Sequence, residues 1–79
     1  MARISIDNIE RQDKTRYMLH DEVYATYTVF EKSGNKYFQI DTYGRDNCEN
    51  PEKLSQSLQI DEETARYLVR LLINAFDMI

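Results

Sequence analysis

The C-terminal segment constrains the fold more than any other part of the chain. Asp61 is a good N-cap, and Glu62 and Glu63 place negative charge where the dipole of a following helix favours it, so the segment predicts a helix over residues 61–77. At 100° per residue, the polar side chains of this helix fall within an arc of about 120°. The remaining arc is apolar apart from Thr64. A helix that lies on a sheet needs an apolar stripe only a little wider than about 100°.

This surplus of apolar surface predicts a second subunit. One stripe of the helix can cover a sheet of the same chain: Ala65, Leu68, Val69, Leu72 and Phe76. A second stripe then has no partner within a monomer: Tyr67, Leu71, Ala75 and Met78. We expect the second stripe to form a homodimer interface. The alternative is that an N-terminal segment, Tyr17, Met18 and Leu19, folds over it.

The small size of the chain also favours a second subunit. A folded monomer of 79 residues and 9.4 kDa exposes about 5,000 Å² and has a thin core, which chains this small usually supplement with disulfides, a metal or a partner subunit. The single cysteine, Cys48, cannot pair within the chain. Cys48 and His20 are the only soft metal ligands, whereas structural zinc sites normally use about four. We therefore expect no metal and no cofactor, and a partner subunit as the supplement.

Other features of the composition indicate a single cytoplasmic domain. The chain has no apolar run as long as a signal peptide or a membrane span, so we expect no membrane partner. A lone thiol is typical of the cell interior. No repeat or flexible linker divides the sequence, and we expect one domain over residues 1–79.

Four strands are predicted before the helix. Residues 3–9 alternate weakly, residues 23–30 are almost all β-branched or aromatic, residues 37–43 are similar, and residues 54–60 alternate cleanly. The polar residues 10–16 and the segment 44–53 are expected to be loops. The fold class is therefore α+β, a four-stranded antiparallel sheet followed by one C-terminal helix (ββββα) that packs on one sheet face.

A hairpin is expected around Ser33 and Gly34. A two-residue loop there pairs Phe30 with Tyr37, Val29 with Phe38, Tyr27 with Ile40, and Tyr24 with Tyr43. A three-residue loop would shift this register by one residue.

If the helix covers the face that carries Val29, Phe38 and Leu58, the opposite face holds aromatic and hydrogen-bonding side chains. We expect these residues to form a ligand face: Tyr24, Thr28, Phe30, Tyr37, Gln39, Tyr43, Ser55, Ser57 and Gln59. Bases stack on exposed aromatic rings, and hydroxyls and amides contact base edges. Three loop cations are expected to steer phosphates: Lys36, Arg45 and Lys53. The alternative is that Tyr and Thr simply favour half-solvated strands.

Two families resemble this chain. The segment from Pro51 to Lys53, followed by Ser57 to Glu63 and a helix, resembles the positive-cofactor-four transcriptional coactivators. That resemblance implies a dimer formed through the helices and single-stranded DNA bound across the sheets. The runs Tyr37 to Gly44, Ser55 to Ser57 and Asp61 to Glu63 resemble short bacterial proteins labelled methionyl-tRNA-formyltransferase-like. Their label implies no activity here, because a formyltransferase needs a folate-binding domain several times this size.

Charge leaves two functions open. Ten basic against fourteen acidic residues, and Asp41 within the predicted ligand face, disfavour a strong nucleic-acid binder, which needs a basic stripe. The first hypothesis, slightly preferred, is a homodimer that binds single-stranded nucleic acid. The second is an acidic module that inhibits or regulates a protein partner, for example as a nucleic-acid mimic.

No catalytic arrangement stands out. His20 is followed by Asp21 and Glu22, but adjacent residues on a strand or loop point in different directions. Cys48 has acidic neighbours that oppose activation of its thiol. We expect a protein without enzymatic activity.

Overall fold

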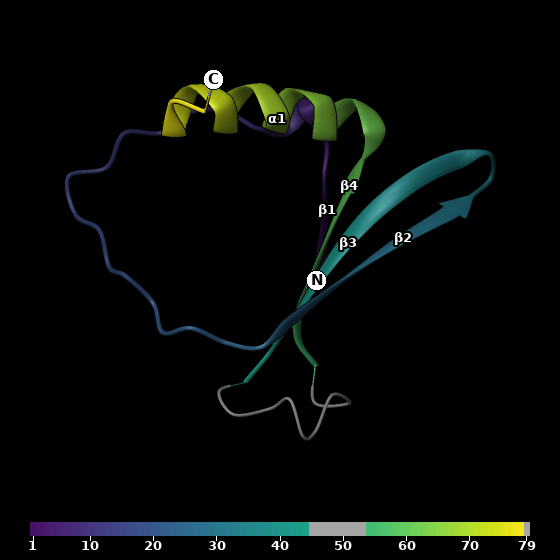
Figure 1. Ribbon diagram of the computed structural model, residues 1–79, viewed down its shortest axis with the longest axis horizontal. Helices are drawn as coiled ribbons and strands as arrows, with labels where there is room; N and C mark the ends of the chain where they lie inside the picture. Colours follow the sequence, from purple (N-terminus) through teal and green to yellow (C-terminus); the bar gives the residue numbers. More distant parts are fainter. Residues whose placement is uncertain (45–53, 79) are drawn as a thin grey trace.

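The computed structural model describes residues 1–44 and 54–78, which form one sheet and one long helix (Figure 1). The elements are β1 (Ala2–Ile4), the 3₁₀ turn η1 (Ile6–Asn8), β2 (Ala25–Lys32), β3 (Asn35–Tyr43), β4 (Leu54–Asp61) and α1 (Glu62–Phe76). The strand order across the sheet is β1-β4-β3-β2. Four strands followed by a C-terminal helix confirm the predicted α+β architecture.

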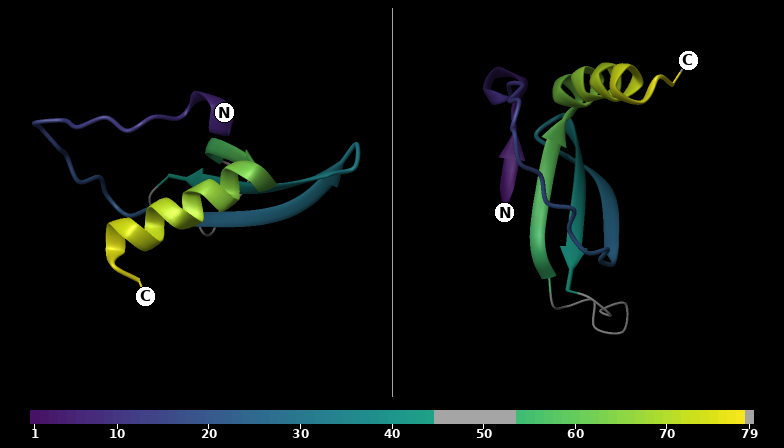
Figure 2. Two further views of the ribbon diagram at one scale, coloured as in Figure 1. Left: turned by 90° about the horizontal axis from the view of Figure 1, so that it is seen from above. Right: turned by 90° about the vertical axis from the view of Figure 1, so that its left-hand side faces the viewer.

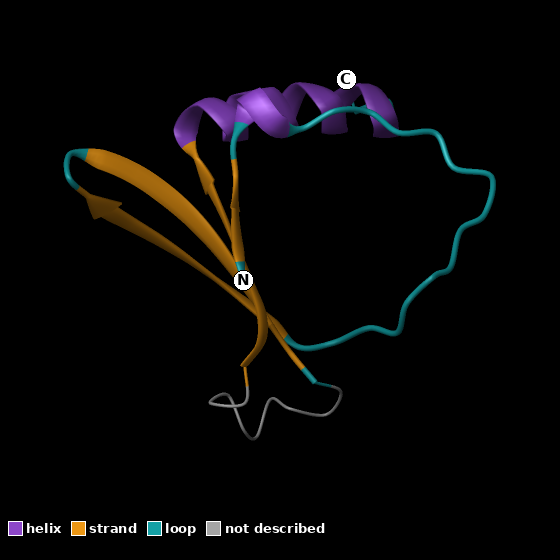
Figure 3. Cartoon of the chain, turned by 180° about the vertical axis from the view of Figure 1, so that it is seen from behind, coloured by secondary structure: helices purple, strands orange, loops and turns teal. Residues whose placement is uncertain are grey.

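The sheet is mixed, so the prediction of an entirely antiparallel sheet is wrong at one edge. β2 with β3, and β3 with β4, are antiparallel, whereas β1 is parallel to β4 and pairs Ala2 with Leu58 and Ile4 with Ile60. Because β1 and β2 run in the same direction, the chain must return along the sheet between them. The long connection visible in Figure 3 makes this return.

The first strand is also shorter than the alternation over residues 3–9 predicts. It ends at Ile4, and Ser5 then caps η1 by accepting a hydrogen bond from the Asp7 backbone N–H at 3.2 Å. A side chain that bonds its own backbone competes with strand pairing, which accounts for the early end of β1.

The β2–β3 hairpin has the predicted two-residue loop. Ser33 and Gly34 have φ of 55° and 81°, and two positive values in succession are typical of the type I′ turn that fits the twist of a hairpin. The predicted register is confirmed: Phe30 with Tyr37, Val29 with Phe38, and Tyr27 with Ile40. Beyond the ladder, the Tyr43 N–H donates to the Tyr24 carbonyl at 2.9 Å.

The helix begins and ends close to the predicted residues. The Asp61 carboxylate accepts a hydrogen bond from the Thr64 backbone N–H at 2.9 Å, as an N-cap does. At the other end Asp77 is left-handed, with φ of 51°, and the Met78 N–H donates to the Ile73 carbonyl at 3.1 Å.

Only the beginning of α1 packs on the sheet. The helix contacts the ends of β3 and β4 and the turn η1, and then projects away from the strands (Figures 1 and 2). Ala65 and Leu68 are partly covered, whereas Val69, Leu72 and Phe76 are exposed. The stripe predicted to cover the sheet therefore does so only over its first turns.

The chain buries little of its own surface. Among the described residues only Tyr43 and Thr64 are buried. The accessible surface is 7425 Å², against about 5,000 Å² expected for this mass. The radius of gyration is 14.7 Å, against about 12 Å expected for a compact chain of this length. A large part of the surface that a folded chain of this size normally covers is thus left open.

Candidate functional site

The two faces of the sheet carry different chemistry, as the pairing register shows. Successive side chains on a strand point to opposite faces, and paired residues share a face. The apolar face, on the side of α1, holds Ile4, Ala25, Tyr27, Val29, Phe38, Ile40, Leu58 and Ile60. The polar face holds Arg3, Thr26, Thr28, Phe30, Tyr37, Gln39, Asp41, Tyr43, Ser57 and Gln59.

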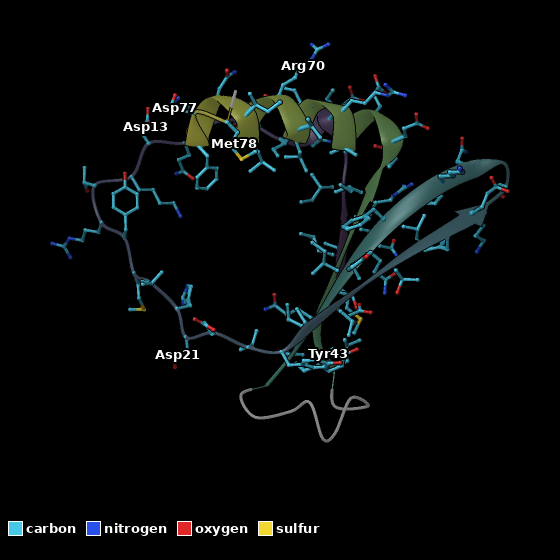
Figure 4. The ribbon with its side chains drawn as sticks, viewed as in Figure 1. Asp13, Asp21, Tyr43, Arg70, Asp77 and Met78 are labelled. Carbon is cyan, nitrogen blue, oxygen red and sulfur yellow. The ribbon has the colours of Figure 1, made fainter. Side chains whose placement is uncertain are left out.

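Two pairs of aromatic rings lie at opposite ends of the polar face. Phe30 and Tyr37, beside the hairpin turn, are stacked with ring centroids 5.4 Å apart and planes at 26°. Tyr24 and Tyr43, at the end remote from α1, have centroids 5.3 Å apart and planes at 40° (Figure 4). The six-residue step between Tyr24 and Phe30 along the chain corresponds to about 20 Å. Predicted ligand residues therefore form two separate aromatic pairs rather than one surface, and Tyr43 of the second pair is buried.

A chain of hydrogen bonds crosses the polar face between these pairs. The Gln59 amide Nε2 donates to Gln39 Oε1 at 2.7 Å, and Gln39 Nε2 donates to Asp41 Oδ1 at 2.8 Å. The Ser57 hydroxyl donates to the same Asp41 oxygen at 2.5 Å. These bonds fix the polar side chains in place before any ligand arrives, which lowers the entropic cost of binding.

Two adjacent hollows lie on the polar face, and Arg3 and Gln59 line both. The stacking hollow, of about 260 Å³, is lined by Arg3, Phe30, Lys32, Tyr37 and Gln59. The amide hollow, of about 420 Å³, is lined by Met1, Ala2, Arg3, Gln39, Ser57 and Gln59. An aromatic pair with two cations and an amide beside it can hold a planar, anionic ligand.

The two cations of the stacking hollow, Arg3 and Lys32, are not among the three predicted phosphate-steering residues. Lys32 follows Phe30 by two residues, so alternation alone could have placed it on the same face. Arg3 could not be placed in this way, because its position depends on the parallel pairing of β1 with β4, in which Arg3 lies beside Gln59.

Of the predicted phosphate-steering residues, Lys36 lies within the described part of the chain. Lys36 lies on the apolar face, where it pairs across the hairpin with Glu31, because it is one residue before Tyr37 on the strand. Lys36 therefore does not share a face with the Phe30–Tyr37 pair, and its expected role in steering phosphates stays a prediction. Arg45 and Lys53 lie outside the described residues.

The remaining predicted ligand residues lie at the margins of the polar face. Thr28 is exposed and pairs with Gln39. Ser55 is exposed and falls at a β-bulge, where Thr42 pairs with Gln56 but Tyr43 pairs with Leu54. The bulge re-aims Ser55, so simple alternation does not fix its direction.

The predicted dimer stripe is largely uncovered. Tyr67 is partly buried, whereas Leu71, Ala75 and Met78 are exposed. The N-terminal segment does not fold over this stripe. Its side chains Tyr17, Met18 and Leu19, in the connection between η1 and β2, are 81%, 78% and 99% exposed.

Asp61, at the start of α1, has a lowered pKa. The hydroxyl and backbone N–H of Thr64 both stabilise the ionised carboxylate of Asp61 and hold its pKa below the ordinary value. A hollow of about 610 Å³ lies beside this carboxylate, and three more acidic residues, Glu31, Glu62 and Glu63, line it together with Lys36 and Arg66.

Over residues 1–44 and 54–78, no group of three or more His, Cys, Asp or Glu side chains is arranged to hold a metal ion. Within the same ranges, no helix is long and apolar enough to cross a membrane. His20 lies in the exposed connection before β2, and Cys48 lies outside the described residues.

Comparison with known proteins adds no relative: no protein-family model, no characterised protein and no solved structure matches the chain.

Proposed function

We propose that this protein is a small, non-enzymatic, cytoplasmic homodimer that binds single-stranded nucleic acid on its polar face. The stacking hollow carries the proposal. It brings the stacked rings of Phe30 and Tyr37 together with the cations Arg3 and Lys32 and the amide of Gln59. These are the three kinds of group that a nucleotide needs: a surface for its base, charge for its phosphate and a hydrogen-bonding partner for the base edge.

A single strand suits this face better than a duplex does. Stacking on an aromatic side chain requires a base whose own face is free, and it contributes about 1–3 kcal/mol per base. The site has few cations and the chain has a net charge of −4, so affinity should be moderate and should fall only modestly as salt rises. The resemblance to the positive-cofactor-four family implies the same kind of ligand.

The homodimer accounts for the open apolar surface. Each chain exposes about 2,400 Å² more than a compact monomer of this mass. Covering that excess on two chains would bury about 4,800 Å², which lies within the range of obligate dimers. The apolar face and the second stripe of α1, Tyr67, Leu71, Ala75 and Met78, are the surfaces available for it. Light scattering at micromolar concentration should give twice the chain mass, and a monomeric mass would contradict the dimer.

Fluorescence anisotropy with a labelled oligonucleotide tests the binding function. We expect the protein to bind the single strand and not the matching duplex, and to lose affinity as salt rises. Tyr37→Ala should weaken binding further, because it removes one ring of the stacked pair. No binding to any single strand at low salt would rule the proposal out.

A second candidate rests on the acidic hollow at the start of α1. Four acidic residues, Glu31, Asp61, Glu62 and Glu63, line it with two cations, Lys36 and Arg66, and the net negative charge suits a basic protein partner. A pull-down from host lysate separates the candidates. A protein captured equally with and without nuclease, and lost in Glu62→Lys with Glu63→Lys, would favour the second candidate over the first.

A further inference from the structure

The hydrogen-bond chain on the polar face has a fixed direction. The ionised carboxylate of Asp41 can only accept hydrogen bonds, so Gln39 must turn its NH₂ group toward Asp41. The Gln39 carbonyl oxygen then points to Gln59, which must donate to it. The Gln59 carbonyl oxygen consequently points away from Gln39.

This direction leaves acceptors facing outward. Among the described residues, no hydrogen bond uses the second oxygen of Asp41, Oδ2, or the carbonyl oxygen of Gln59. Neither atom is among the buried side-chain atoms that lack a hydrogen-bond partner, so both are accessible to solvent. A ligand on this part of the face therefore meets oxygen atoms that need donors.

The position of these acceptors matches the edge of a stacked base. Gln59 lines the stacking hollow beside Phe30 and Tyr37, and it also lines the amide hollow with Gln39 and Ser57. A base on the Phe30–Tyr37 pair thus has its edge toward Gln59. The amide hollow continues from Gln59 along the face, and two of its lining residues, Ser57 and Gln39, donate the hydrogen bonds that hold Asp41 beside it.

We infer that the polar face selects bases with an exocyclic amino group, and cytosine over thymine in particular. This inference rests on the proposed binding of single-stranded nucleic acid. Cytosine presents its N4 amino group as a donor where thymine presents the O4 acceptor, and Asp or Glu is a known partner of cytosine N4. The two bases are both pyrimidines, so the comparison holds ring size constant.

The test measures the affinities of the whole protein for oligo-dC and oligo-dT of about 12 nucleotides, by fluorescence anisotropy at neutral pH and about 50 mM salt. We expect oligo-dC to bind at least about fivefold more tightly. Asp41→Asn should bring this ratio close to one, because the asparagine amide can donate to thymine O4. The substitution also removes a negative charge and so strengthens binding of both strands, but the ratio cancels that effect.

Two further variants complete the design. Gln56→Met is the matched control, because it makes the same change as Gln59→Met on the same strand, at a residue that pairs with Thr42 and lies outside the polar face; the ratio should be unchanged. Gln59→Met removes the second acceptor at similar volume and should lower the ratio by itself, which keeps the test decisive if Asp41→Asn does not fold.

The outcomes separate the inference from the function on which it rests. Equal affinities for the two strands would overturn the base preference while leaving the proposed function standing. A preference that persists in folded Asp41→Asn and in Gln59→Met would overturn its assignment to these acceptors. If neither strand binds at low salt, the proposed function fails and the preference fails with it.

Discussion

The two faces of the sheet differ in how far a single chain completes them. On the polar face, hydrogen bonds from Gln39, Ser57 and Gln59 and two aromatic pairs shelter most of the side chains. On the apolar face, Tyr27 and Val29 are 72% and 61% exposed. This is the reverse of an ordinary monomer, in which apolar side chains are the better covered. This contrast is what the proposed function requires: a polar face with its side chains held in place for a ligand, and an apolar face that a second chain would cover.

The largest effect should come from placing a charge on the apolar face. Val29→Glu would put an uncompensated carboxylate into the proposed dimer contact, at a cost of at least about 3 kcal/mol, or roughly a hundredfold in association. We expect light scattering to show a monomer, with loss of a cooperative melting transition. Thr28→Glu is the matched control, since it adds the same charge one residue earlier on the other face. A dimer that tolerates both changes equally would remove the contrast between the faces.

The second-largest effect distinguishes the aromatic pair on the polar face from the aromatic pair on the apolar face. Phe30→Ala breaks the Phe30–Tyr37 pair and should reduce oligonucleotide affinity by about fivefold to a hundredfold, with the dimer intact. Tyr27→Ala breaks the Tyr27–Phe38 pair, whose centroids are 5.5 Å apart, and should weaken the dimer without changing affinity per dimer. Anisotropy and light scattering on both variants test this. A weaker dimer in Phe30→Ala and a lower oligonucleotide affinity in Tyr27→Ala would show that the two faces have the opposite roles.

A smaller effect is expected where the sheet passes into α1. Asp61→Ala removes the N-cap and should lower the melting temperature by a few degrees. Because the folded-state pKa of Asp61 is below its ordinary value, the ionised cap stabilises the fold fully above about pH 4, and this contribution is lost as pH falls through the folded value. Asp61→Asn keeps a hydrogen-bond acceptor that does not titrate. Acid should therefore lower the urea midpoint of the wild type more than that of Asp61→Asn. An unchanged difference between the two midpoints at pH 7 and pH 3 would contradict the role given to this carboxylate.

The smallest effect concerns a single bond within the polar face. The Thr26 hydroxyl and the Tyr43 hydroxyl are 3.3 Å apart, and Thr26→Val removes this bond at a cost of about 0.5–1.5 kcal/mol. Urea denaturation should show the loss, while the dimer mass stays unchanged. A shift in oligomeric state would mean that the polar face also contributes to association.

Local patterns in the sequence predict the elements well because they act over short distances. The alternation of β2 and β3, the Ser33–Gly34 turn and the Asp61 cap each depend on residues within a few positions, and each is found where it is expected. The division of β2 and β3 into two faces follows from the same alternation, which is why most of the predicted ligand residues share one face.

The parts that the sequence does not predict depend on contacts between distant segments. No local pattern reveals that β1 lies parallel to β4, and so none reveals that Arg3 joins the stacking hollow. The angle at which α1 leaves the sheet is likewise set by tertiary contacts. An amphipathic helix has the same periodicity whether it covers its own sheet or another chain.

The shortness of β1 has a consequence for how the site behaves in time. A three-residue edge strand held by one neighbour opens at a small free energy, and Arg3 leaves the stacking hollow whenever it does. The complete hollow would then be one member of an equilibrium, and the affinity expected for the proposed ligand would be the intrinsic affinity reduced by the fraction of molecules in which β1 is paired. A bound strand would draw that equilibrium toward the paired form, so ligand binding should appear in hydrogen exchange as slower exchange of the β1 amides.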